Sequence, residues 1–145
     1  MKIGIASDHH GIEKRKELVK FLEKEGYEVV DFGPNTKENI DYPEYAFKVS
    51  KDVQSKAIDF GILMCGTGIG MSIAANKIKG IRCARICSID DARLCKEHNN
   101  ANIIAFSANI RLGLQKKMIN TFLKTIPSNE ERHIRRVNMI DEYHD

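Results

Sequence analysis

The sequence predicts an α/β fold built on a parallel sheet. Short runs rich in β-branched residues alternate along the chain with longer segments of helical spacing. One run, at 58–64, is apolar nearly throughout, as in a central strand covered on both faces. No linker or internal repeat divides the 145 residues, so we expect a single domain over 1–145. Strands joined by helical crossovers form a parallel sheet with right-handed connections.

The first part of the chain contains two of the expected strands. Residues 2–7 (KIGIAS) form a short β-rich run. Residues 12–25 place apolar side chains at helical spacing, and Gly26 follows as a helix-ending residue. The second strand is YEVVDF at 27–32. The segment 33–43 is rich in Gly, Pro and Asn, which predicts a loop.

The middle of the chain continues the alternation. A helix is expected at 44–56, and IDFGILM at 58–64 is the third strand. The next helix covers 69–79 and ends before Gly80. IRCARIC at 81–87 is the fourth strand.

The last part of the chain contains one strand and three helices. We expect a helix at 89–98, a strand at 102–106 (NIIAF) and a helix at 111–125 that ends before a proline. Ser128 and Glu131 fit the S-x-x-E pattern of a capping box, which predicts a final helix.

Composition and charge narrow the function classes. The chain is 42% hydrophobic and 30% charged, with a net charge of +3. We find no basic stripe with interleaved aromatics, so a small anion is favoured over nucleic acid as a ligand. No apolar run reaches the length of a membrane span, and the N-terminal residues do not resemble a signal peptide. We therefore expect a cytoplasmic protein that does not associate with membranes.

The cysteines do not predict a metal site. Cys83, Cys87, Cys95 and His98 have no spacing typical of zinc ligands. Cys83 and Cys87 are expected to lie in the fourth strand and to be part of the core, with all thiols reduced.

The segment CGTGIG, residues 65–70, carries the strongest functional signal. It follows a buried strand and precedes a helix, where alternating glycines can turn backbone N–H groups toward an anion. In that position Cys65 is expected to favour its thiolate form. Two other interpretations stay open. The segment can be a tight turn beside a structural cysteine. It can also be a dinucleotide fingerprint, although Met71 replaces the third glycine; Asp90–Asp91 lie about 20 residues further on.

Other polar residues lie at expected strand and helix ends. Asp8 and His9 follow the first strand, at the edge where ligands bind in parallel sheets, while His10 is interpreted as a surface residue. His98 ends a helix with Asn99, where a histidine is often only a partner of the helix dipole.

Two arginines lie on the expected last helix. Arg132 and Arg136 are four residues apart on one face, and two guanidinium groups so placed match a phosphate. A solvated basic face is the alternative.

Six segments occur together in the order and spacing of one family: SDHHG at 7–11, DYP at 41–43, CGTGIGMSIAANK at 65–77, GIR at 80–82, EHNNAN at 97–102 and RHIRRV at 132–137. The chain resembles the RpiB/LacAB family of sugar-phosphate isomerases, and the resemblance covers essentially its whole length. It implies a three-layer, Rossmann-like fold with a five-stranded parallel sheet of order 2-1-3-5-4 and a C-terminal helix. It also implies a homodimer or tetramer with active sites shared between subunits, and neither cofactor nor metal.

The resemblance implies conversion of ribose 5-phosphate to ribulose 5-phosphate through a cis-enediolate, with a role for each matched residue. Cys65 is the base that moves a proton between C2 and C1. Thr67 and the backbone amides of the glycine segment stabilise the enediolate; these amides belong to Gly66, Gly68, Ile69 and Gly70. Asp8 and His9 bind the sugar and its phosphate end. His98 opens the furanose ring, Asn99 helps to hold the developing charge, and Arg132 and Arg136 grip the phosphate.

One departure from the family affects the phosphate end. Many members carry an arginine after the fifth strand, where this chain has Asn109, with Arg111 two residues on. Allose 6-phosphate and galactose 6-phosphate isomerases remain alternatives, although His98 and Asn99 favour the pentose enzyme. A non-catalytic sugar-phosphate sensor would need the glycine segment but not the thiol of Cys65. A nicotinamide-dependent oxidoreductase would need a separate substrate domain, for which 145 residues leave little room.

Overall fold

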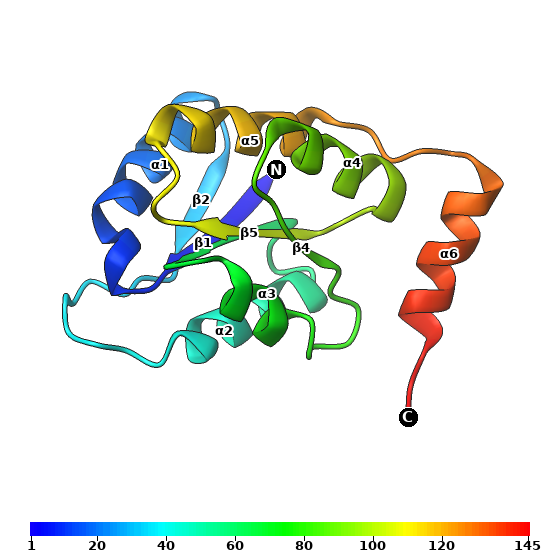
Figure 1. Cartoon of the computed structure of the whole chain (residues 1–145), viewed down its shortest axis with the longest axis horizontal. Helices are drawn as coiled ribbons and strands as arrows, with labels where there is room; N and C mark the ends of the chain where they lie inside the picture. The colour runs from blue at the N-terminus through cyan, green and yellow to red at the C-terminus, as the bar shows by residue number, and fades with distance from the viewer.

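A computed structural model describes residues 1–145 and shows a five-stranded parallel sheet between two layers of helices (Figure 1). The order β2-β1-β3-β5-β4 confirms the order expected from the family resemblance. The strands are β1 (Lys2–Ser7), β2 (Glu28–Asp31), β3 (Phe60–Cys65), β4 (Cys83–Arg85) and β5 (Ile103–Ser107). The helices are η1 (His9–Gly11), α1 (Ile12–Lys24), α2 (Tyr42–Gln54), α3 (Ile69–Ala75), α4 (Ile89–Asn99), α5 (Leu112–Lys124) and α6 (Glu131–Glu142).

The two faces of the sheet are covered by different helices. Helices α1, α4 and α5 lie on one face, and α2 and α3 lie on the other (Figure 1). Successive strand residues point to opposite faces of the sheet, as the pleat requires. Ile62 and Met64 pack in the core beneath α1, α4 and α5, whereas Leu63 and Cys65 pack in the core beneath α2 and α3. This alternation places Cys65 at the carboxyl end of β3 on the α3 side of the sheet.

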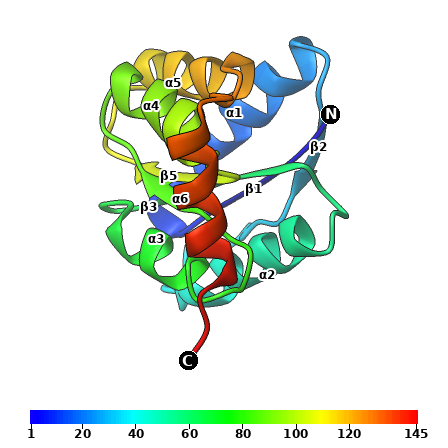
Figure 2. The ribbon, with the colours of Figure 1, turned by 90° about the vertical axis from the view of Figure 1, so that its right-hand side faces the viewer.

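Helix α6 lies outside the two layers. It extends along one side of the domain beyond β4 and α4 (Figure 2). Its C-terminal end is held to the body by Asp141, whose carboxylate pairs with Arg82 at 2.7 Å. Ile134, Met139 and Ile140 on this helix are 47%, 64% and 54% exposed. No helix of the structure combines the length and apolar character that a membrane span requires.

Two expectations for the fourth strand are wrong in part. Strand β4 covers only Cys83–Arg85, because the chain leaves the sheet at this edge to begin α4. Cys83 is buried as expected, whereas Cys87 is exposed. The backbone N–H of Cys87 donates to the carboxylate of Asp91 in the first turn of α4, so Cys87 belongs to a helix-starting turn rather than to the sheet.

The helix ends differ from the expected ones for local reasons. Helix α2 begins at Tyr42 rather than at residue 44, since a proline is well tolerated in a first turn. Helix α3 ends at Ala75, earlier than the expected residue 79. The expected capping box is absent. The hydroxyl of Ser128 accepts a hydrogen bond from the N–H of Glu130 and contacts Nδ1 of His133, so it stabilises the loop before α6.

Candidate active site

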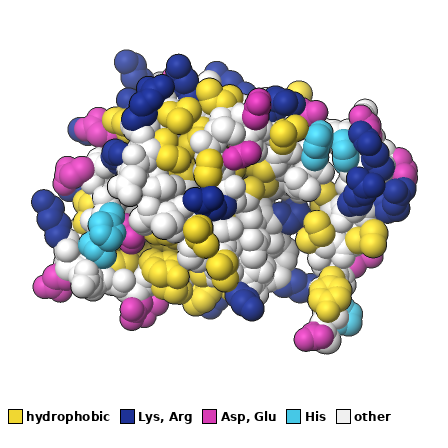
Figure 3. All heavy atoms as spheres, in the orientation of Figure 1, with side chains coloured by type: hydrophobic (Ala, Val, Ile, Leu, Met, Phe, Trp, Pro, Cys, Tyr) yellow, Lys and Arg dark blue, Asp and Glu magenta, His cyan; other side chains and the backbone are white.

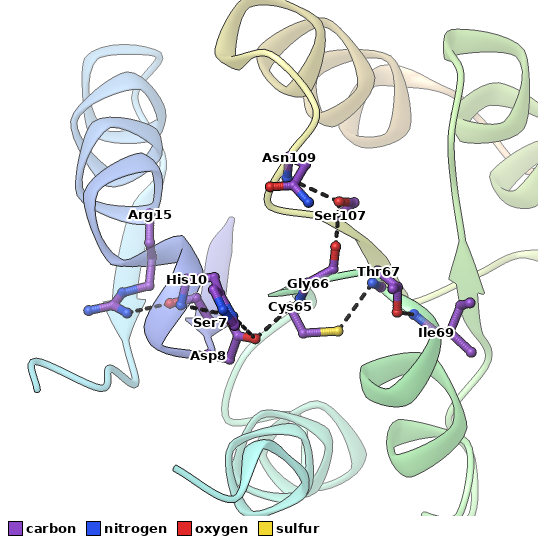
Figure 4. Close-up of polar contacts among 11 residues, drawn as sticks. Ser7, Asp8, His10, Arg15, Cys65, Gly66, Thr67, Ile69, Ser107 and Asn109 are labelled. Atoms are coloured by element: carbon purple, nitrogen blue, oxygen red, sulfur yellow. Dashed lines mark hydrogen bonds and ion pairs between the residues drawn. The ribbon is translucent and has the colours of Figure 1, made fainter. Parts of the chain in front are cut away.

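The carboxyl ends of three neighbouring strands form the centre of the candidate site. Ser7 in β1 is paired in register with Met64 in β3, and Cys65 is paired with Ser107 in β5. The turns that follow these strands therefore meet at one edge of the sheet, as parallel topology predicts. In Figure 4 hydrogen bonds connect these turns, from Asp8 to Gly66 and from Gly66 through Ser107 to Asn109.

Asp8 links the turn after β1 to the turn after β3. The residue is 7% exposed, and its Oδ2 atom accepts a hydrogen bond from the N–H of Gly66 at 3.2 Å. Its Oδ1 atom accepts from the N–H of His10 at 2.9 Å, and Nδ1 of His10 lies 3.1 Å from Oδ2 (Figure 4). His10 is exposed, as expected of a surface residue, but the prediction did not include its contact with Asp8. The two-residue spacing after an aspartate was the available signal.

A buried arginine, Arg15, contacts the carboxyl ends of β1 and β2. Arg15 is fully buried, and its guanidinium donates to the hydroxyl of Ser7 at 2.6 Å. Its Nε atom lies 2.9 Å from the carboxylate of Asp31 at the end of β2. Arg15 thus connects two strand ends and stabilises the backbone next to Asp8. Its place in a helical pattern did not indicate this role.

The thiol of Cys65 lies under the glycine segment. It is 5% exposed, and its Sγ atom accepts a hydrogen bond from the N–H of Gly68 at 3.1 Å. Gly68 adopts φ of 78°, and an added Cβ would lie 2.7 Å from Cα of Phe106. Only glycine therefore allows the segment to lie on β5 and to direct its amide at the sulfur. The hydroxyl of Thr67 accepts a hydrogen bond from the N–H of Ile69 at 3.1 Å.

Some of the backbone N–H groups expected to bind an anion are already bonded to side chains of the chain itself. The amides of Gly66 and Gly68 already bond Asp8 and Cys65. Gly70 begins α3 with Ile69, and its missing side chain makes room for the phenol ring of Tyr42. The first amides of a helix have no helical partner, which leaves the N–H of Gly70 free to bind a ligand oxygen.

The turn after β5 holds two further groups. Ser107 donates its hydroxyl proton to the carbonyl of Gly66 at 2.7 Å and accepts the N–H of Asn109 at 3.0 Å. Lys14 donates from Nζ to the carbonyls of Ala108 and Ile110 at 2.6 and 2.8 Å. The chain thus places a lysine ammonium on the turn that contains Asn109.

Arg111 lies two residues beyond Asn109, at the start of α5. It forms the N-cap position of α5, and its guanidinium lies over Gly113 in the first turn of that helix. The ammonium of Lys14, by contrast, binds the carbonyls on both sides of Asn109, a role that its position in the sequence did not indicate.

Four predicted site residues do not lie at the edge of the sheet that holds Cys65. His98 and Asn99 end α4, which runs back from the carboxyl edge toward the amino end of β5. Since β5 has five residues, it separates these two residues from Cys65 by about 13 Å or more. Arg132 and Arg136 lie exposed on α6, with Nε of Arg132 bonded to Glu130 at 2.9 Å.

The residues at this second edge form a cluster of their own. The ring of His98 stacks on that of His133 in α6, with ring centroids 4.4 Å apart. A pocket of about 110 Å³ lies between the end of α4 and α6 and is lined by His98, Ser128, Ile134 and neighbouring residues. The predicted site residues of one chain therefore form two groups at opposite edges of the sheet, which we call half-sets. One lies around Cys65, and the other consists of His98, Asn99, Arg132 and Arg136.

The donor atoms of the chain show where a metal could bind. Ligand atoms of Asp8, His9 and His10 all lie within 4.8 Å of one another.

Cys83 and Cys95 are buried, and burial raises their pKa values to about 12 and about 11. Both thiols are therefore protonated at neutral pH, as expected for core cysteines.

The fold and this edge define a class of protein: a parallel α/β domain with a cysteine, an aspartate and a glycine-rich turn at the carboxyl ends of adjacent strands. The sequence comparison makes the class specific, since residues 3–140 match the family model described as Ribose/Galactose Isomerase. The chain belongs to this family.

Three relatives show how far the similarity extends. Ribose-5-phosphate isomerase B of Escherichia coli is 43% identical over 84% of this chain and 83% of its own. The structure of ribose-5-phosphate isomerase B from Clostridium thermocellum is 46% identical, with a TM-score of 0.94 over 98% of this chain and 96% of that one. The enzyme from Mycoplasma genitalium with bound ribulose-5-phosphate is 39% identical, with a TM-score of 0.93 over 98% of this chain and 95% of that one.

Proposed function

We propose that this protein interconverts ribose 5-phosphate and ribulose 5-phosphate without a cofactor. The observation that carries the proposal is the arrangement of Asp8, Gly66, Cys65 and Gly68, in which one turn bonds both a carboxylate and a thiol. The similarity to an enzyme whose structure holds ribulose-5-phosphate supports the same substrate class. The sensor alternative does not need the sulfur in this position.

The reaction is a proton transfer between neighbouring carbons. The thiolate of Cys65 removes the proton from C2 of the open-chain aldose, the C–H electron pair forms a C1–C2 double bond, and the carbonyl pair moves to O1. The thiol of Cys65 then returns the proton to C1 of the cis-enediolate, while the proton of O2 passes to O1 and the O2 electron pair forms the C2 carbonyl. Because this step develops negative charge on oxygen, hydrogen-bond donors next to the base stabilise its transition state.

Particular donors suit this role. The hydroxyl of Thr67 has its proton available, since its oxygen already accepts from the N–H of Ile69. The free N–H of Gly70 is the second donor that we propose. The Gly68 amide keeps its bond to the sulfur and favours the thiolate. Asp8 and His9 then bind sugar hydroxyls and the phosphate end.

We also propose that two copies of the chain share their sites, in a homodimer or in a tetramer built from two such dimers. The separation of His98, Asn99, Arg132 and Arg136 from Cys65 supports this arrangement, since those residues then serve the partner's Cys65 edge. In that position His98 would open the furanose ring, Asn99 would bind the developing charge, and the two arginines would bind the phosphate.

The surface of α6 also favours a second copy as its partner. Hydrophobic side chains show on this helix beside its arginines in Figure 3, and Met139 and Ile140 are 64% and 54% exposed. On α3, next to the Cys65 turn, Ile73 is 61% exposed. Apolar surfaces at both half-sets would be buried together if the half-sets met.

The test is ribulose 5-phosphate formation from ribose 5-phosphate by the purified protein, without added cofactor and in the presence of EDTA. Turnover that survives EDTA and collapses in Cys65→Ala would support the reaction, the base and independence from a metal at Asp8 and His9. Turnover only on allose 6-phosphate or galactose 6-phosphate would replace the substrate. Binding of these sugars without turnover on any would favour the sensor.

A further inference from the structure

The peptide group between Thr67 and Gly68 makes two hydrogen bonds in opposite directions. Its N–H, on Gly68, donates to Sγ of Cys65 at 3.1 Å. Its carbonyl, on Thr67, accepts from Nε of Arg85 at 3.1 Å. In a planar trans peptide the N–H and C=O groups point in opposite directions. The guanidinium of Arg85 and the sulfur of Cys65 therefore lie at the two ends of one peptide dipole.

We propose that Arg85 is a positioning residue for Cys65, acting through this peptide group. The inference rests on the proposed role of Cys65 as the base. A charged donor on the Thr67 carbonyl fixes the orientation of the peptide and polarises it. The Gly68 N–H then becomes a stronger donor to the sulfur and favours its thiolate form. Arg85 needs no contact with the substrate to have this effect.

The packing of the glycine segment explains how an arginine two strands away reaches this peptide. Gly68 lies directly on the backbone of Phe106, so the segment leans across the end of β5 toward β4. Arg85 is the last residue of β4 and pairs in register with Ala105 of β5. Its side chain therefore emerges beside the Thr67 carbonyl, at the same edge of the sheet as Cys65.

The Thr67 carbonyl is free to accept this bond. Helix α3 begins at Ile69 with Gly68 as its N-cap, and the first bond of the helix runs from the N–H of Ser72 to the carbonyl of Gly68. The carbonyl of Thr67 lies one residue before that ladder. Arg85 thus provides the partner that the helix does not.

The test measures the reactivity of the sulfur itself. The rate at which iodoacetamide alkylates Cys65 is measured as a function of pH in the protein without substrate. Peptide mass spectrometry identifies the alkylated cysteine. All proteins carry Cys87→Ser, because the exposed Cys87 also reacts. Arg85→Met removes the donor and its charge, and Arg85→Lys keeps the charge. Arg93→Gln, which removes an exposed arginine from α4, is the matched control.

We expect Arg85→Met to slow alkylation at neutral pH by roughly 3- to 10-fold and to move the midpoint of the pH–rate profile upward. Arg85→Lys should lie between Arg85→Met and the Cys87→Ser parent, and Arg93→Gln should match the parent. In the isomerase assay, kcat of Arg85→Met should fall with little change in KM.

The inference would be overturned if folded Arg85→Met gave the same alkylation profile as the parent. If KM also rose in that protein, Arg85 would instead be a direct ligand of the substrate anion. If Arg85→Met does not fold, Arg85→Lys decides in the same way. The alkylation test needs no substrate, so absence of isomerase activity would refute the proposed function without deciding the role of Arg85.

Discussion

Asp141 near the end of α6 forms an ion pair of 2.7 Å with Arg82, which precedes β4. Arg82 also donates from Nε to the carbonyl of Asn100 at 3.0 Å, so it holds α6 against the end of α4. This contact fixes the direction of the helix that carries Arg132 and Arg136. In the shared-site arrangement that we propose, it would set where those arginines meet the partner.

Asp141→Asn should therefore weaken the attachment of α6. We expect a loss of about 1 kcal/mol in the free energy of unfolding, since the carboxylate of a partly buried ion pair is replaced by a neutral amide. We also expect weaker subunit association, measured by sedimentation, and a higher KM for ribose 5-phosphate. Glu17→Gln, which breaks an exposed pair with Lys20 on α1, is the control and should change neither. Unchanged association and KM in Asp141→Asn would show that this contact does not position α6.

Removal of the sulfur should affect turnover more than binding. We expect Cys65→Ala to lower kcat by about 100- to 10,000-fold, the usual contribution of a positioned base, with KM changed less than about threefold. The matched control is Cys95→Ala, which removes a buried thiol that lies outside the site. Steady-state kinetics on ribose 5-phosphate measures both constants. An equal loss of kcat and of substrate affinity would count against Cys65 as the base.

The two neighbouring arginines of α6 should differ in their effect. Arg136→Ala should chiefly raise KM, because a phosphate contact is present in both the ground state and the transition state. Arg135 pairs with Glu131 within the same helix, and Arg135→Ala is expected to leave KM nearly unchanged. Kinetics on ribose 5-phosphate at two salt concentrations separates direct contact from general charge. An Arg136→Ala protein with wild-type KM would remove Arg136 from the site.

Gly68 and Gly26 allow backbone strain to be separated from steric overlap. Both have positive φ, but only at Gly68 would an added Cβ meet other atoms, at 2.7 Å from Phe106. Gly26→Ala should cost about 1 kcal/mol of unfolding free energy through strain alone. Gly68→Ala should cost about 3 kcal/mol or more and should also slow alkylation of Cys65, because the segment must shift. Urea unfolding compares the two; equal losses would show that the segment yields without cost.

Lys96 should make stability depend on pH. It is 4% exposed, with Nζ over the rings of Phe60 and Phe122, and burial lowers its pKa to about 8. Between this value and the ordinary 10.5, the unfolded chain binds more protons than the folded one. The contribution of Lys96 to the free energy of unfolding therefore rises with pH across that window and is lost as pH falls through about 8.

Urea unfolding between neutral pH and pH 9 tests this expectation, because the raised pKa values of Cys83 and Cys95 lower stability only above the ordinary thiol pKa of 9.0. Lys96→Met should flatten the rise, whereas Lys20→Met, at an exposed position on α1, should keep it. A slope that survives in Lys96→Met would assign the dependence to another group.

Much of the fold could be predicted because its signals are local. Hydrophobic periodicity and turn residues located the five strands and the helices α1 to α5, with errors mainly at their ends; the short helix η1 was not expected. The end of β4 is an example. It is set by the N–H of Cys87, which donates to the carboxylate of Asp91 instead of to a carbonyl of β5. The strand order came from the family resemblance, since periodicity alone does not say which strands are neighbours.

The sequence by itself determined the candidate base and its setting, because Cys65, Gly66 and Gly68 lie within four residues of one another and their chemistry depends on a single turn. Only the tertiary structure decided which distant groups act on that turn. Asp8 reaches Gly66, and Arg85 reaches the Thr67 carbonyl, through contacts between separate strands. Such contacts depend on strand order and register, which leave no periodic trace in the sequence.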